Sequence, residues 1–211
     1  MELGQGSCDM ARSTGPKNRL ARRTGQDLGL KSNPMKVARR INILPGQHGR
    51  RGRRKSSEYG EQLAEKQKVK YIYGLLEKQF HKLYVLAAKT PASTGKVLLS
   101  LLERRLDNVV FRLGFVPTRT AARQLVAHGN VLVNGKKLDI PSYSVRLGDV
   151  VSISDKAMKI PYIADLLKEK DKTVPKWLEK KAVAGKVLRF PERDEIDAGI
   201  QEQRIVEFYS R

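Results

Sequence analysis

The run Arg104-Arg105-Leu106-Asp107-Asn108-Val109-Val110-Phe111-Arg112-Leu113-Gly114-Phe115, with the residues that follow it up to Ile153, decides the fold. Its apolar residues recur at i, i+3, i+4 and i+7, which is typical of one face of a helix; they are Leu106, Val109, Val110 and Leu113. Polar residues lie at helical spacing on another face, namely Arg105, Asn108 and Arg112, with Arg104 beside them. The pattern predicts an amphipathic helix with a cationic side.

A second, shorter helix is predicted after Pro117. Thr118 is placed to cap its start, and Gly129 can adopt the left-handed conformation that ends a helix. Ala122, Leu125 and Val126 point inward in this interpretation. Arg119 and Arg123 are four residues apart, so we expect them to share the outer face.

A hairpin signal follows the second helix. Asn134-Gly135 suits a tight turn whose two central residues both need positive φ. Gly148-Asp149 and the run Val150-Val151-Ser152-Ile153 indicate a further turn and strand. The stretch therefore predicts a module of two helices on a short sheet, with its cations on one side.

This stretch resembles the RNA-binding module named after the small-subunit ribosomal protein S-four. The matching residues are Arg105 to Val110, Arg123-Gln124-Leu125-Val126 and Val133-Asn134-Gly135. The resemblance implies that the paired helices form a positive shelf for folded RNA. Several RNA-modifying enzymes and some tRNA synthetases carry a similar module, so this stretch alone does not identify a protein.

The overall charge points to a polyanionic partner. The chain has 211 residues and a formal net charge of +20. Residues 1 to 60 hold 14 Lys or Arg against 4 Asp or Glu, whereas residues 161 to 211 hold 11 against 10. We expect nucleic acid to meet the N-terminal and central parts and the C-terminal part to serve packing.

Targeting signals and cysteines narrow the class further. The sequence contains no run of 18 apolar residues and no apolar signal-peptide core, so we expect no membrane partner. The single Cys8 excludes an intramolecular disulfide framework and suits a reducing cytoplasm.

The N-terminal region is basic and glycine-rich. We expect residues 1 to 9 to be disordered and residues 12 to 31 to be a flexible arm that folds on RNA. Five cations occupy the six positions Arg50-Arg51-Gly52-Arg53-Arg54-Lys55, directly after Leu44-Pro45-Gly46-Gln47-His48-Gly49. Such a run is either a solvated loop, a nuclear-localisation-like tract or a phosphate-binding segment, and we favour the last.

Helical periodicity organises the flanks of the module. Residues Glu61 to Phe80 predict one amphipathic helix, with Lys66, Lys68, Lys70 and Tyr71 off its apolar stripe and either solvated or near phosphate. Further helices are expected over Leu83 to Ala88, from Thr94 with a break near Glu103, and around Ile163. Trp177 should anchor a turn, and the tail from Glu202 to Arg211 should be docked.

These flanks extend the resemblance to nearly the whole chain. Leu44 to Gly49, Tyr59 to Lys70, Tyr73-Gly74, the module and the ending Ile205 to Ser210 are similar, in order, to the bacterial small ribosomal subunit S-four family. The resemblance implies an α+β fold: a mainly helical domain, completed by the C-terminal tail, with the module inserted as two helices on a short antiparallel sheet. We expect an arm at 1–30, a helical rRNA-binding domain at 31–102, the module at 103–165 and a C-terminal segment at 166–211 that packs back on the helical domain.

The resemblance also implies a function and partners. We expect a structural constituent of the small ribosomal subunit, located in the cytoplasm on the ribosome. The implied partners are rRNA at a helix junction in its 5′ region, neighbouring small-subunit proteins, and mRNA near the channel through which it enters. The implied roles are nucleation of subunit-body assembly and a contribution to translational accuracy.

The zinc site that many relatives carry is not expected here. Asn18 and Ala21 stand where two of four N-terminal cysteines would be, and Cys8, His48, His81 and His128 are too scattered to form a tetrahedral ligand set. We therefore expect the zinc-free form, without cofactor or metal.

No catalytic constellation is recognisable, so we expect neither an enzyme nor a small-molecule substrate. Asp107 and Glu103 are better explained as partners for nearby arginines. An RNA-modifying enzyme, such as a pseudouridine synthase, is the alternative, but only 57 residues follow residue 154. A free-standing stress-response RNA binder is a third, weaker interpretation.

The expected RNA ligands combine the basic run with the module's polar residues. They are Gln47, His48, Arg50, Arg51, Arg53, Arg54, Lys55, Arg104, Arg105, Asn108, Arg112, Arg119, Arg123, Gln124, Asn134, Lys136 and Lys137.

Overall fold

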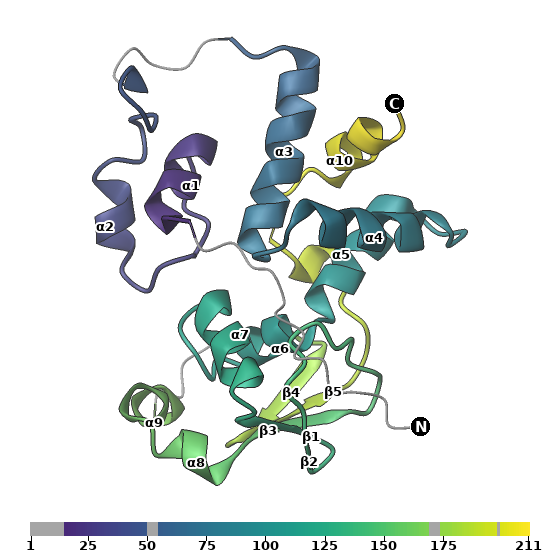
Figure 1. The fold of residues 1–211 in the computed structure, drawn as a ribbon. Coiled ribbons are helices and arrows are strands. Elements are labelled where there is room, and N and C mark those ends of the chain that lie inside the picture. Colours follow the sequence, from purple (N-terminus) through teal and green to yellow (C-terminus); the bar gives the residue numbers. More distant parts are fainter. Residues whose placement is uncertain (1–14, 50–54, 169–173, 198) are drawn as a thin grey trace, which may run out of the picture.

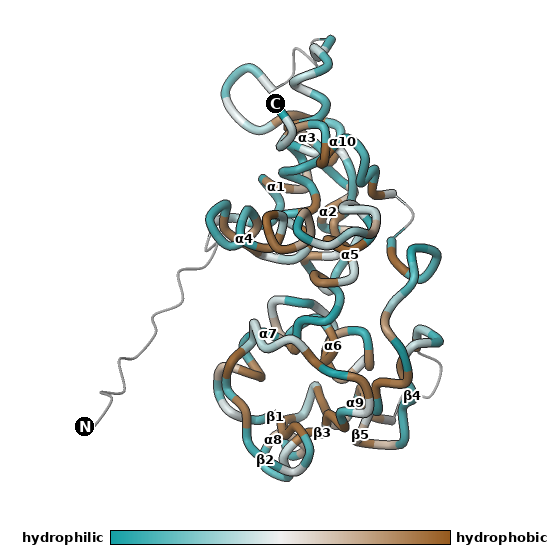
Figure 2. Tube along the Cα trace, turned by 90° about the vertical axis from the view of Figure 1, so that its right-hand side faces the viewer, coloured by the Kyte–Doolittle hydropathy of each residue, from teal (hydrophilic) through white to brown (hydrophobic). Residues whose placement is uncertain are grey.

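The computed structural model describes residues 15–49, 55–168, 174–197 and 199–211. It has a helical part and a part with a five-stranded sheet, which lie one above the other in Figure 1. Each part has its own core of buried apolar residues, and the apolar segments gather in these two places in Figure 2. The α+β fold class is therefore confirmed.

The helical domain is built mainly from the N-terminal half of the chain. Its elements are α1 (Lys17–Thr24), α2 (Pro34–Ala38), α3 (Glu58–Ile72), α4 (Glu77–Ala88), α5 (Thr94–Glu103), the short 3-10 helix η2 (Arg193–Glu195) and α10 (Glu202–Tyr209). Val69, Phe80, Leu98, Leu102 and Ile205 are among its fully buried side chains. The expected flexible arm thus contains a helix, α1, that contacts α3.

The expected single helix from Glu61 to Phe80 is wrong. Helix α3 ends at Ile72, and Gly74 adopts φ +64°, a conformation that an L-residue side chain disfavours. The chain turns there and α4 begins at Glu77. The apolar periodicity runs through the break because both helices face the same core.

The C-terminal tail is docked, as expected. Helix α10 packs against α3 and α5 and buries Ile205 completely. Gln62 donates a hydrogen bond to Glu207 at 3.1 Å, and the Tyr209 hydroxyl donates to Glu77 at 2.7 Å. These hydrogen bonds join residues that are more than 130 positions apart and hold α10 on the helical domain.

The sheet-containing part begins with the two expected helices, α6 (Leu106–Arg112) and α7 (Arg119–Ala127). The Thr118 hydroxyl accepts a hydrogen bond from the Ala121 amide at 3.2 Å, so Thr118 caps α7. Asn134 and Gly135 have φ of 51° and 77°, and they connect β1 (Val131–Val133) to β2 (Lys136–Lys137). The predicted cap and hairpin turn are both confirmed.

The sheet is larger than the sequence indicated. Strand β3 (Val150–Ile153) pairs antiparallel with β1 and with β5 (Ala184–Val187), and β4 (Leu178–Lys181) completes the order β2-β1-β3-β5-β4. The segment 166–211 therefore does not pack on the helical domain as a whole, because its strands belong to the module. Helices α8 (Asp155–Met158) and α9 (Pro161–Lys168) connect β3 to this added hairpin.

No helix in the described ranges is both long enough and apolar enough to cross a lipid bilayer.

Trp177 should be essential for holding the β4–β5 hairpin on the module, because only 1% of its surface is exposed and it lies in the module core. We expect Trp177→Ala to lower the free energy of unfolding by about 3 to 5 kcal/mol in urea titrations. The neighbouring exposed residue gives the control, Lys176→Ala, for which a change within about 0.5 kcal/mol is expected. Equal stability of the two variants would show that the hairpin does not support the module.

Candidate nucleic-acid interface

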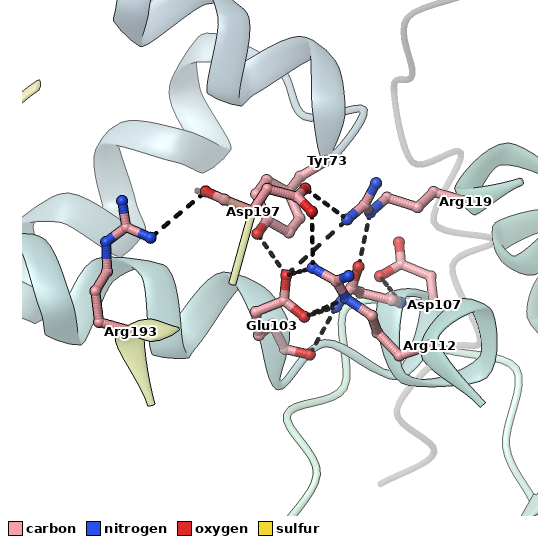
Figure 3. Close-up of polar contacts among 8 residues, drawn as sticks. Tyr73, Glu103, Asp107, Arg112, Arg119, Arg193 and Asp197 are labelled. Atoms are coloured by element: carbon pink, nitrogen blue, oxygen red, sulfur yellow. Dashed lines mark hydrogen bonds and ion pairs between the residues drawn. The ribbon is translucent and has the colours of Figure 1, made fainter. Parts of the chain in front are cut away.

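A buried carboxylate lies where the two parts of the molecule meet. Glu103, the last residue of α5, has no exposed surface. The Tyr73 hydroxyl donates to its Oε1 at 2.6 Å, and Asn108 Nδ2 donates to its Oε2 at 2.7 Å. Figure 3 shows Tyr73, which directly follows α3, and Arg112 of α6 converging on Glu103.

Two arginines of the module complete this cluster. Arg112 forks onto Glu103, with Nε 2.9 Å from Oε2 and Nη2 2.8 Å from Oε1. Arg119 donates through Nε to Asn108 Oδ1 at 2.8 Å. Bidentate pairing fixes both the position and the plane of a guanidinium, so Arg112 orients α6 against α5.

The C-terminal segment also enters the cluster through Asp197. Its two carboxylate oxygens lie 3.5 Å from Arg112 Nη2 and 3.4 Å from Arg119 Nη2. Arg193 in turn donates to the Asp197 carbonyl at 3.4 Å. We call Tyr73, Glu103, Asn108, Arg112, Arg119 and Asp197 the interdomain network.

Burial and ion pairing shift the pKa of Glu103 in opposite directions. Burial alone would raise the pKa of Glu103, but the hydrogen bonds and charge of Arg112, with Arg119 and Tyr73, hold that pKa below its ordinary value. Burial, followed by the neighbouring Glu103 charge, raises the pKa of the Tyr73 hydroxyl. Glu103 is therefore an anion and Tyr73 a neutral donor at neutral pH.

Several predicted RNA ligands are inside the protein. Arg105 is only 6% exposed and forks onto Asp107 at 3.2 and 3.0 Å, and Asn108 is 2% exposed. Arg112 and Arg119 direct their guanidinium groups to Glu103, Asn108 and Asp197. These four side chains therefore have partners within the protein that helical spacing could not show, and their contact with RNA stays a prediction.

A groove beside the network contains the remaining polar residues of α7. Arg123, Gln124 and Thr120 line it from α7, and Lys17 and Tyr71 line it from the helical domain. Arg123 Nη1 lies 3.9 Å from the Asp107 carboxylate. Lys17 and Thr120 were not among the predicted ligands, and only the basic composition of the arm pointed to Lys17.

The β1–β2 hairpin carries a second cationic feature. Lys136 and Lys137 are exposed on the edge strand β2. Asn134 at the turn is used differently, because its Nδ2 donates to Asp149 at 2.8 Å and its Oδ1 accepts from the Val150 amide at 2.9 Å. The two lysines are thus held outward on a turn that Asn134 fixes.

The predicted basic loop is described only in part. Gln47, His48 and Lys55 are exposed, whereas Arg50, Arg51, Arg53 and Arg54 lie outside the described residues. Arg22 donates to the carbonyls of Ile43 and Leu44 at 2.7 and 2.9 Å. A Cβ at Gly49 would lie 1.8 Å from the Leu44 carbonyl oxygen, so only glycine fits this turn.

Two lysines of α3 are structural. Lys66 bonds to Glu77 at 2.8 Å, and Lys68 contacts Glu65 and the Gly199 carbonyl; both side chains are buried. Burial would raise the pKa of Glu77, but the bonds from Lys66, Tyr209 and Lys70 lower it to about 2. These lysines therefore hold α3, α4 and the C-terminal segment together instead of lying free for phosphate.

No group of three or more potential metal ligands occurs in the part of the chain that the structure describes, and Cys8 lies outside it.

Two family models match adjacent stretches of the chain, and the boundary between them lies next to Glu103 of the interdomain network. The model described as ribosomal protein S4/S9 N-terminal domain matches residues 12–103, and the S4 domain model matches residues 104–151. Proteins named small ribosomal subunit protein uS4 are 53% identical in Herpetosiphon aurantiacus, 51% in Aquifex aeolicus and 49% in Parabacteroides distasonis. Each comparison covers 96% of this chain and 100% of the relative. The chain belongs to the uS4 family.

The uS4 assignment confirms the resemblance and removes one alternative. Members of this family are ribosomal proteins and not enzymes, so an RNA-modifying enzyme is excluded. The boundary between the two family models falls directly after Glu103, so the network joins the N-terminal domain to the S4 domain.

Glu103→Gln should destabilise this uS4 chain at neutral pH, since Gln cannot accept from Arg112, Asn108 and Tyr73 together. Breaking a buried ion pair typically costs about 3 to 5 kcal/mol. The folded-state pKa of Glu103 is below the ordinary value of 4.5, so its stabilisation is present above that value and is lost as the pH falls through the folded-state pKa. Urea titrations of the wild-type chain and of Glu103→Gln between pH 7 and pH 3 should therefore show a difference in the free energy of unfolding that shrinks on acidification. A pH-independent difference would contradict an ionised Glu103.

Arg105→Ala should destabilise the chain, because it leaves the buried Asp107 carboxylate without its two hydrogen bonds from Arg105. We expect the free energy of unfolding to fall by about 3 to 5 kcal/mol. Gln124→Ala on the exposed face of α7 is the control, with a change within about 0.5 kcal/mol. An unchanged melting temperature for Arg105→Ala would restore Arg105 to the candidate RNA ligands.

Proposed function

We propose that this chain is a structural rRNA-binding protein of the small ribosomal subunit. The observation that carries the proposal is the separation of its cations into residues paired inside the protein and residues at its surface. The surface set comprises Lys136 and Lys137 on the hairpin and Lys55. Folded RNA is recognised largely through phosphates, 2′-hydroxyls and shape, which suits cations held on a rigid frame.

Rigidity supports this proposal as much as charge does. The network holds α5, α6 and α7 in one arrangement, so the two sides of the groove are positioned before RNA arrives. A binding site that is already ordered loses less conformational entropy on association. Tyr71, half-buried in the groove, offers an aromatic face for an unpaired base.

Membership of the uS4 family supports the finer parts of the proposal. The site is a junction of helices in the 5′ region of the rRNA, and early binding there nucleates assembly of the subunit body. Neighbouring small-subunit proteins contact the chain, mRNA passes near it in the channel through which it enters, and the chain contributes to translational accuracy. The location is the cytoplasmic ribosome.

Sedimentation tests the proposed function. The tagged chain expressed in cells should travel with small ribosomal subunits through a sucrose gradient and stay with them at moderate salt. A chain that remains at the top of the gradient, or travels only with unrelated complexes, would contradict it.

Lys136→Ala with Lys137→Ala should weaken binding to a small-subunit rRNA transcript without changing the melting temperature, because both side chains are exposed. Each phosphate that is no longer neutralised should reduce the slope of log affinity against log salt by about 1, so the slope of the double variant should fall by roughly 2. Filter binding at several salt concentrations measures this slope. Lys181→Ala is the control, since Lys181 is also exposed and lies on the hairpin at the opposite edge of the sheet, where it pairs with Glu179. Equal slopes for all three proteins would remove the β1–β2 hairpin from the interface.

A further inference from the structure

Arg104 differs from the other arginines near the network. It directly follows Glu103, but its Nε donates to the Val145 carbonyl at 3.3 Å and its guanidinium carbon lies 4.0 Å from the centroid of the Phe190 ring. Arg105, Arg112 and Arg119 each face a carboxylate. Among the described residues, no carboxylate lies within 4.0 Å of the Arg104 guanidinium.

Without a nearby carboxylate, the partly buried charge of Arg104 is not neutralised within the part of the protein that the structure describes. Arg104 is partly buried, and this burial alone lowers the pKa of its guanidinium. Arginine nevertheless stays protonated in proteins, so the site holds a partly desolvated positive charge that an anion would stabilise. Stacking uses the flat face of the guanidinium and leaves N–H groups on its edge for a phosphate.

Phe190 supplies the second half of the site. It lies in the connection between β5 and η2, and it remains 40% exposed although Arg104 covers part of it. An aromatic ring supported on one side by a cation presents its other side as a platform for a planar group. Unpaired nucleobases bind proteins by stacking on aromatic rings of this kind.

Exposed cations lie on the segments around this pair. The loop that carries Arg146 runs beside the Phe190 segment, because the Gly148 amide donates to Val187 and the Val145 amide donates to the Arg104 carbonyl, each at 2.9 Å. Arg146 and Lys186 are both exposed. The nearby carboxylates of Glu192 and Glu195 are paired with Arg189 at 3.0 and 2.7 Å. The charge around the ring therefore complements a polyanion.

We propose that Arg104 and Phe190 form a nucleotide-binding site in which an unpaired RNA base stacks on Phe190 and the adjoining phosphate accepts hydrogen bonds from Arg104. This site deepens the proposed function and rests on it, because it presumes that RNA binds the chain. None of its residues lines the groove at α7, so it is a second point of contact on the same molecule.

Binding of the full chain to a small-subunit rRNA transcript tests the site. Phe190→Ala should weaken binding roughly 5- to 100-fold, the range expected when the stacking of one base is removed. Phe190→Trp should retain affinity because it keeps a flat ring, whereas Phe190→Leu should behave like Phe190→Ala. Arg104→Gln should also weaken binding and reduce the salt slope by about 1. Leu188→Ala is the control, because Leu188 is 52% exposed in the same segment and should be neutral.

A second arm identifies the source of the nucleotide. Weaker binding to the rRNA transcript assigns the site to rRNA, and weaker binding only to an unstructured RNA oligonucleotide assigns it to a single strand that passes the subunit. Unchanged affinity of Phe190→Ala and Arg104→Gln for both RNAs would overturn the proposal. Weakened binding of Phe190→Ala to small-subunit proteins, with both RNA affinities unchanged, would overturn it in favour of a protein contact. Either result would leave the proposed function standing if the wild-type chain binds the transcript, whereas failure of the wild-type chain would defeat that function itself.

Discussion

The carboxylate of Glu103 is the constraint on which the rest of the structure depends. An ion with no contact to water is tolerated only if charged and neutral donors surround it, and here those donors come from Tyr73, Asn108 and Arg112. They are distributed over the end of α3 and over α6, so the carboxylate is satisfied in only one arrangement of these elements. The position of the S4 domain relative to the helical domain follows from this requirement.

The same constraint divides the positive charge of the chain into two classes. Arg105, Arg112 and Arg119 neutralise buried or half-buried carboxylates. Lys136 and Lys137 are instead exposed on the edge strand β2. The net charge of +20 is typical of a polyanion-binding protein, but it does not say which cations would contact the polyanion.

Local features of the fold were predictable because their causes are local. The cap at Thr118, the turn at Asn134-Gly135 and the break after Glu103 each depend on residues a few positions apart. The joining of β4 and β5 to the sheet was not predicted, because it depends on tertiary packing. The end of α3 at Ile72 was missed although Gly74 is a local signal for it, because the apolar periodicity continues into α4. For the site, sequence spacing placed Arg119 beside Arg123, but it could not show that Asn108 and Asp197 turn Arg119 inward. Asp197 lies 78 residues away from Arg119, and no periodicity connects them.

Chemical footprinting tests this division of the cations most directly. Lysines would be acetylated and arginines modified with phenylglyoxal, in the free chain and in its complex with a small-subunit rRNA transcript, and the modified residues identified by mass spectrometry. The account predicts that Lys136 and Lys137 react in the free chain and are protected by RNA, while Arg112 is unreactive in both states. An Arg112 that reacts in the free chain and is protected by RNA would contradict it, because the interdomain network would then be the RNA-binding surface.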